Sequence, residues 1–171
     1  MIARFAAWYD ARPVTGDACL AAALALFVVP SDLADAPVNL AFSLPLLACV
    51  PLRRRHPVPV FVAVSVICLA QLALLDHIVA GDVVALIALH TLVAAADVRL
   101  AVAGTLAGVA GAGLAALRWN PEQVSLLEVA ASTVISVLLA ATLGAWRRTR
   151  LAELAALEQR NRSDERARIA R

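Results

Sequence analysis

Long apolar stretches separated by short polar segments constrain this chain more than any other feature of its sequence. Of the 171 residues, 62% are apolar and 16% are charged, whereas a soluble globular domain has about 45–50% and about 25%. A water-soluble domain of this size cannot bury so much apolar surface. The composition therefore predicts a membrane protein. It excludes a disordered chain, a disulfide scaffold, a nucleic-acid-binding domain and a soluble enzyme.

Six stretches are apolar enough to form membrane-spanning helices. An α-helix rises about 1.5 Å per residue, so a span across roughly 30 Å of hydrocarbon needs about 20 residues, and fewer where the span is short. The expected spans cover residues 13–29, 38–52, 57–75, 81–96, 99–119 and 124–146. Pro30 is expected to end the first span. The predicted fold class is therefore all-α, a polytopic transmembrane bundle of about six spans followed by a C-terminal cytoplasmic helix at residues 147–171.

The distribution of arginine predicts the orientation of these spans. All 15 basic residues are arginine, and with six spans only Arg118 falls on the side opposite to the others. The residues that set the topology are Arg53, Arg54, Arg55, Arg147, Arg148 and Arg150. Positively charged loops stay in the cytoplasm. We therefore expect a multi-pass protein of the plasma membrane with both termini in the cytoplasm.

The N-terminal segment, residues 1–12, precedes the first span. Its apolar and aromatic residues, Ile2, Phe5, Trp8 and Tyr9, favour a segment that lies among the lipid headgroups. A cleavable secretory signal is the alternative, because residues 18–29 and the following Ala34-Asp35-Ala36 also fit that pattern.

Polar residues within the apolar stretches are candidates for intramembrane sensing. These are His90, Gln71 and Glu128. His90 could be a proton sensor, or it could form a structural hydrogen bond with Gln71, Ser132 or Thr133, which is the interpretation we favour. Glu128 lies about one turn inside the sixth span and is expected to extend outward toward Arg118.

The remaining polar and small residues predict packing rather than chemistry. Asp76, His77 and Asp82 could bind a metal, but we interpret them as a solvated loop, and no metal or cofactor site is predicted. Gly104 and Gly108 form a small-xxx-small pattern that favours close helix packing in the bundle or between protomers. The three cysteines, Cys19, Cys49 and Cys68, are expected to be buried thiols.

The segment 147–171 contains an apolar stripe on an otherwise charged helical pattern. Its members are Leu151, Leu154 and Leu157. The stripe extends over less than two heptads, whereas a convincing coiled coil needs three or four. Two interpretations stay open at this point: a solvated helix that continues the sixth span, and the stalk of a parallel dimer.

Residues 164–171, Asp-Glu-Arg-Ala-Arg-Ile-Ala-Arg, carry a family resemblance. They resemble the run immediately before the Glu-Leu-His-Asp phosphoacceptor box of a group of bacterial sensor histidine kinases, which is abundant in actinobacteria and signals to LuxR-type response regulators. Four further features are similar to the layout of that group's membrane region: Asp17, residues 53–58, residues 88–92 and residues 147–150. The resemblance extends over nearly the whole chain.

This resemblance implies a function without implying a catalytic residue. It implies the membrane sensor module of a two-component histidine kinase, ending just before the phosphoacceptor box, so that ATP, Mg²⁺ and the response regulator all belong to a kinase core outside this chain. It also implies a parallel homodimer. The alternatives are a small transporter or channel subunit, in which His90, Gln71 and Glu128 would line a path, and a plain membrane anchor.

Overall fold

A computed structural model describes residues 13–119 and 125–169 of the chain. Over these residues the structure is helical and contains no β-strand, which confirms the predicted all-α class. The α-helices are α2 (Pro13–Asp35), α3 (Leu40–Cys49), α4 (Pro57–Leu74), α5 (Val83–Ala95), α6 (Val98–Arg118) and α7 (Leu126–Ile169). Three short 3₁₀ helices lie between them: η1 (Pro37–Asn39), η2 (Val50–Leu52) and η3 (Ala80–Asp82).

Within residues 13–119 and 125–169, four helical segments are long and apolar enough to cross a membrane. They are Thr15–Asp35, Pro57–Leu74, Val98–Arg118 and Leu126–Ser163. Two shorter apolar segments, Pro37–Leu52 and Ala80–Ala95, lie between the long ones. The predicted positions of the third and fifth spans agree with α4 and α6 to within one residue at each end.

Large apolar side chains cover the outside of the molecule. Leu26 is 81% exposed, Leu127 78% and Leu106 65%, although each belongs to a helix that is long enough to span a bilayer. Water would penalise this arrangement by about 1.5–3 kcal/mol for each such side chain, whereas lipid tails solvate it. The surface is therefore that of a membrane protein. Cys19 is exposed for the same reason, so the prediction that this thiol is buried was wrong.

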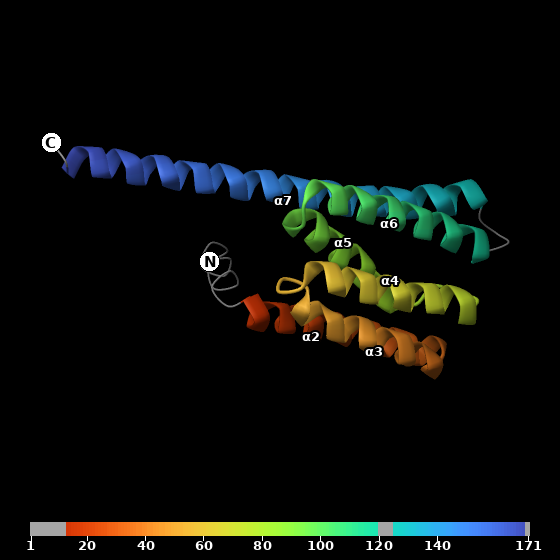
Figure 1. Cartoon of the computed structure of the whole chain (residues 1–171). Coiled ribbons are helices and arrows are strands. Elements are labelled where there is room, and N and C mark those ends of the chain that lie inside the picture. Colours follow the sequence, from red (N-terminus) through yellow and green to blue (C-terminus); the bar gives the residue numbers. More distant parts are fainter. Residues whose placement is uncertain (1–12, 120–124, 170–171) are drawn as a thin grey trace.

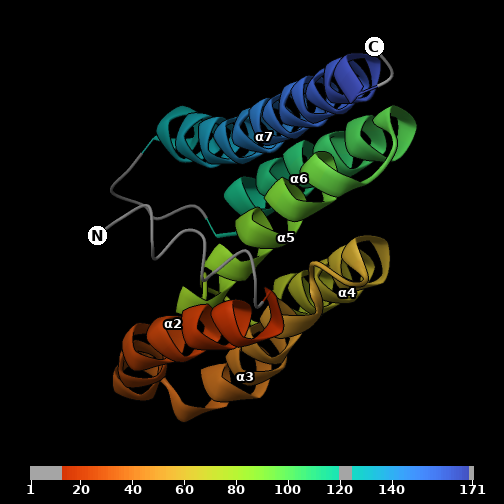
Figure 2. The ribbon, with the colours of Figure 1, turned by 90° about the vertical axis from the view of Figure 1, so that its left-hand side faces the viewer.

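The helices form two groups that meet at α5. Viewed end-on, α2, α3 and α4 lie together and α6 lies beside α7, with α5 between the two groups (Figure 2). One cluster of buried side chains includes Val84 and Ala88 of α5 and extends into α2, α3 and α4. A second cluster includes Leu89 and Val93 of α5 and extends into α6 and α7. The short helix α5 thus connects the two groups.

The up-and-down course of the chain gathers the helix ends into two sets. At one end, Asp17 in the first turns of α2 contacts Arg53, and Arg148 of α7 contacts Ala96, the residue that follows α5. At the other end, Asp32 of α2 contacts Ala80, and Arg118 contacts Asp76. We call these the Arg53 end and the Asp32 end.

One predicted helix limit differs from the structure. Helix α2 continues through Pro30 to Asp35, so Pro30 does not end the first span. Proline removes one backbone hydrogen bond, but a transmembrane helix tolerates this loss where neighbouring groups satisfy the backbone. Helix α7 continues without interruption across residue 146, as expected for a tail helix that continues the sixth span, and extends far beyond the other helices (Figure 1). The predicted segment at residues 1–12 lies outside the described part of the chain.

Candidate functional site

A buried ion-pair cluster at the Arg53 end ties the start of α2 to the turn before α4. The Asp17 carboxylate has no exposed surface. Its Oδ1 lies 2.8 Å from Nη2 of Arg53, and its Oδ2 lies 3.0 Å from Nε of Arg54. The two arginines were predicted to set the topology. In the structure they also hold the start of α2 against the turn before α4. Asp17 was not predicted as their partner, although an aspartate in the first turns of an apolar span needs a cation.

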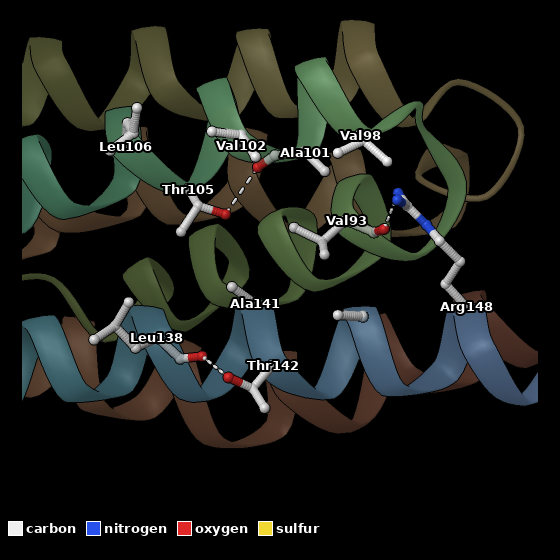
Figure 3. Close-up of a pocket in the computed structure, with 11 residues that line it drawn as sticks. Val93, Val98, Ala101, Val102, Thr105, Leu106, Leu138, Ala141, Thr142 and Arg148 are labelled. Atoms are coloured by element: carbon white, nitrogen blue, oxygen red, sulfur yellow. Dashed lines mark hydrogen bonds between the residues drawn. The ribbon is translucent and has the colours of Figure 1, made fainter.

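Arg148 connects α7 to the end of α5. Its Nη2 donates hydrogen bonds to the backbone carbonyls of Val93 and Ala96. Figure 3 shows the side chain reaching from α7 to Val93. Carbonyls at a helix C-terminus lack partners within the helix and attract cations. Arg148 therefore fixes α7 against α5 at the level where α7 leaves the bundle.

Glycine brings α7 and α5 into close contact one turn before Arg148. A Cβ placed on Gly144 would lie 2.6 Å from the backbone oxygen of His90 and 3.0 Å from Cβ of Val93. On α6, Gly104 faces Leu92 and Gly108 faces Val137, so the small-xxx-small pattern packs within the bundle. A Cβ on Gly111 would meet nothing within 4 Å. Gly144 was missed because a single glycine in a span predicts no particular partner.

His90 does not make the hydrogen bonds that were predicted for it. Ser132 and Thr133 both donate to the carbonyl of Val129 in their own helix, and the Gln71 amide is without a hydrogen-bond partner. Gln71 lies in the last turn of α4, near the Asp32 end, whereas His90 lies in the second half of α5. Because these helices are antiparallel, the two side chains lie at different depths.

Glu128 caps the first turn of helix α7 and does not extend toward Arg118. Its Oε2 accepts a hydrogen bond from the backbone N–H of Ser125 at 3.2 Å, while the Ser125 hydroxyl accepts one from the N–H of Glu128. This is a capping box, which the sequence Ser-Leu-Leu-Glu could have predicted. Arg118 pairs instead with Asp76 at 2.8 Å. Glu128 therefore caps its own helix and makes no ion pair with Arg118.

A cluster of buried polar side chains at the Asp32 end was largely missed by the sequence analysis. Its fully buried members are Asp32, Asn39, Ser43 and Gln71. They come from α2, η1, α3 and α4, and they surround the turn that leads into α5. Asp32 Oδ1 accepts a hydrogen bond from the N–H of Ala80 at 3.2 Å. Of these residues, the sequence analysis had named only Gln71 as a candidate. The others were passed over because short polar residues near the ends of apolar stretches are common and predict no site.

Asp76, His77 and Asp82, which we interpreted as a solvated loop, have separate partners. Asp76 pairs with Arg118, and Nε2 of His77 lies 3.0 Å from Oδ1 of Asn39. Asp82 Oδ2 accepts a hydrogen bond from the N–H of Val79 at 3.3 Å. In the described ranges, no group of three or more His, Cys, Asp and Glu side chains could hold a metal ion.

An apolar groove of about 430 Å³ opens on the surface between α6 and α7. Val98, Val102 and Leu106 line one wall, and Leu138 and Ala141 line the other (Figure 3). The hydroxyls of its two threonines donate to carbonyls of their own helices. The groove thus offers apolar surface to a ligand, with Arg148 at its margin.

The predicted stripe on α7 is exposed beyond the bundle. Leu151 is 54% exposed, Leu154 58% and Leu157 54%. Charged neighbours pair along the same helix, with Arg150 Nη1 lying 3.2 Å from Oε2 of Glu153. An exposed apolar stripe on a charged helix is a surface that a partner helix can cover.

Comparison with known proteins identifies one family. No curated protein and no solved structure matches the chain. The family described as a domain of unknown function, DUF7134, matches residues 5–151, which include the helices α2 to α6 and the first part of α7. The chain therefore belongs to the DUF7134 family.

Proposed function

We propose that this protein is the membrane sensor module of a two-component histidine kinase and that α7 transmits its signal. The observation that carries the proposal is the single helix of 44 residues that runs from inside the bundle to far beyond it. At about 1.5 Å per residue such a helix is about 66 Å long, roughly twice the thickness of the hydrocarbon core. The resemblance of residues 164–171 to the run before a phosphoacceptor box supports the same function.

The proposed topology has six spans, with the Arg53 end in the cytoplasm. The segment Pro37–Leu52 contains ten α-helical and six 3₁₀-helical residues, which corresponds to about 27 Å of helix. The segment Ala80–Ala95 reaches about 25 Å by the same reckoning. Both lengths approach the hydrocarbon thickness, so both short segments can cross the membrane.

A reporter fused after Arg171 tests this orientation. We expect a cytoplasmically active reporter to work at this position, because the arginine clusters keep the Arg53 end inside. A fusion after Asp76 is the matched control, and there a reporter that is active only outside the cytoplasm should work. The reverse pattern would contradict the six-span topology.

The proposed signal path passes from α5 to α7. The connections at the Asp32 end, residues 36, 75–79 and 119–125, are too short to fold a ligand-binding domain. A stimulus would therefore act through the bilayer, through a lipophilic molecule between helices or through a membrane partner. Gly144 and Arg148 hold α7 on α5, so a shift of α5 would move or rotate the tail. Such a switch requires two states of different energy.

The proposed output is a change in the geometry of a parallel homodimer. The exposed stripe of Leu151, Leu154 and Leu157 would form the seam between two α7 helices. A kinase core of the resembled group would then use ATP and Mg²⁺ and pass a phosphoryl group to a LuxR-type response regulator.

Cysteine cross-linking tests the seam. We expect Leu151→Cys and Leu154→Cys to cross-link between protomers in membranes, because their side chains would face each other. Glu153→Cys is the control on the same turns, since Glu153 pairs with Arg150 on an exposed face. Equal cross-linking at all three positions would mean that α7 is a solvated tether.

The same hypothesis predicts a response to rotation of the tail in a kinase fused to this module. One residue inserted after Trp146 rotates the tail by about 100°, and this should change the balance of kinase and phosphatase activity. Insertion of seven residues should largely restore that balance, because two turns return the stripe to nearly the same face. Signalling that is indifferent to both insertions would argue against a helical signal path.

A further inference from the structure

The buried polar cluster at the Asp32 end contains more hydrogen-bonding groups than partners. Among buried side-chain atoms without a hydrogen-bond partner are Oδ2 of Asp32, Oγ of Ser43, Oε1 of Gln71 and Oδ1 of Asp82. Each unsatisfied buried polar group costs about 1–3 kcal/mol. These four atoms are oxygens from four different elements of the fold, α2, α3, α4 and η3. Two amide nitrogens at the same end, Nδ2 of Asn39 and Nε2 of Gln71, also lack a partner.

These oxygens surround one turn of the chain. Asp32 and Asp82 accept hydrogen bonds from the consecutive N–H groups of Ala80 and Val79. Ser43 Oγ lies only 2.5 Å from where a Cβ of Gly81 would be, so the hydroxyl rests directly on the same turn. The Gln71 side chain and the Asp32 charge both act on the Asp82 carboxylate. The fully buried Gln71 side chain thus faces the Asp82 carboxylate.

The charge of this cluster is not balanced by arginine. In the part of the chain that the structure describes, the arginine that pairs at this end is Arg118, and its partner is the exposed Asp76. Asp32 is fully buried and Asp82 is partly buried. Two carboxylates in such surroundings are costly unless a cation compensates them.

We propose that Asp32, Ser43, Gln71 and Asp82 bind one divalent cation of the hard, oxygen-preferring class, Ca²⁺ or Mg²⁺. Carboxylate, amide carbonyl and hydroxyl oxygens are the ligands that these ions prefer, and water completes their coordination. Two carboxylates match the charge of a divalent ion. Asp82 retains partial exposure, which provides a route for the ion from the Asp32 end. The bound ion would hold α2, α3 and α4 to the start of α5.

The test is the thermal unfolding of the purified full chain in detergent, with Ca²⁺ or Mg²⁺ added at constant ionic strength. At a hundredfold excess over Kd we expect one of these ions to raise the unfolding temperature by roughly 5–10 °C. Calorimetric titration should give one ion per chain. Asp32→Asn should abolish both effects. Ser43→Ala, which removes only a hydroxyl, should weaken ion binding by about tenfold or more. This second variant tests the site even if Asp32→Asn does not fold.

Asp76→Asn is the matched control, because Asp76 lies at the same end but is exposed and paired with Arg118. This variant should keep the full response. The proposal is overturned if neither ion shifts the unfolding temperature. It is also overturned if Ser43→Ala keeps the full response, as the control Asp76→Asn should. It is also overturned if acidification stabilises the protein as much as the ion does, because the two carboxylates then share a proton.

Discussion

Replacing Asp17 by asparagine should destabilise the bundle by about 3–5 kcal/mol, the range found when one partner of a buried ion pair is removed. Both Arg53 and Arg54 point at this carboxylate, and Arg53 is only 7% exposed. The substitution keeps the shape of the side chain but removes its charge. We expect the loss to appear as a lower denaturant midpoint for helix unfolding in detergent.

Glu153→Gln is the control for this prediction. Glu153 also pairs with an arginine, Arg150, but both side chains are more than half exposed, so its removal should cost less than about 1 kcal/mol. Arg53→Gln combined with Asp17→Asn should cost less than the sum of the two single changes, because the groups interact. Similar small losses for Asp17→Asn and Glu153→Gln would show that the buried pair does not hold α2 in place.

Replacing Gly144 by alanine should separate α7 from α5 and cost about 1–3 kcal/mol, as overpacking of a tight contact does. The added Cβ would meet the backbone oxygen of His90 at 2.6 Å. A backbone atom cannot rotate away as the end of a side chain can, so the helices must move apart. That movement would also strain the hydrogen bonds from Arg148 to Val93 and Ala96.

Gly111→Ala is the matched control, since a Cβ there meets nothing within 4 Å. Alanine is a better helix former than glycine by up to about 1 kcal/mol, so this variant should be neutral or stabilised. Both variants are compared by thermal unfolding in detergent. In a kinase fused to this module, Gly144→Ala should also alter signalling, whereas Gly111→Ala should not. Equal stabilities of the two variants would contradict the close approach of α5 and α7.

Local signals in the sequence predicted the helices well. In lipid every backbone N–H and C=O must be satisfied within the segment, so an apolar stretch of sufficient length is compelled to be helical. For this reason α4 and α6 were predicted to within a residue. The same local logic failed at Pro30, because tolerance of proline depends on what surrounds the helix. The capping box of Ser125 and Glu128 was not predicted, although its sequence signal is local.

The sequence by itself determined that this is an all-helical membrane protein with its arginines concentrated beside the apolar stretches. Only the tertiary structure decided which polar side chains meet. Asp17 and Arg53 are 36 residues apart, and Asp32 and Ala80 are 48 residues apart. The membrane-spanning segments are apolar around nearly their whole circumference, so hydropathy does not say which face turns inward. The rotation of each helix is fixed instead by close packing at Gly144 and by buried polar groups, which are interactions between distant parts of the chain.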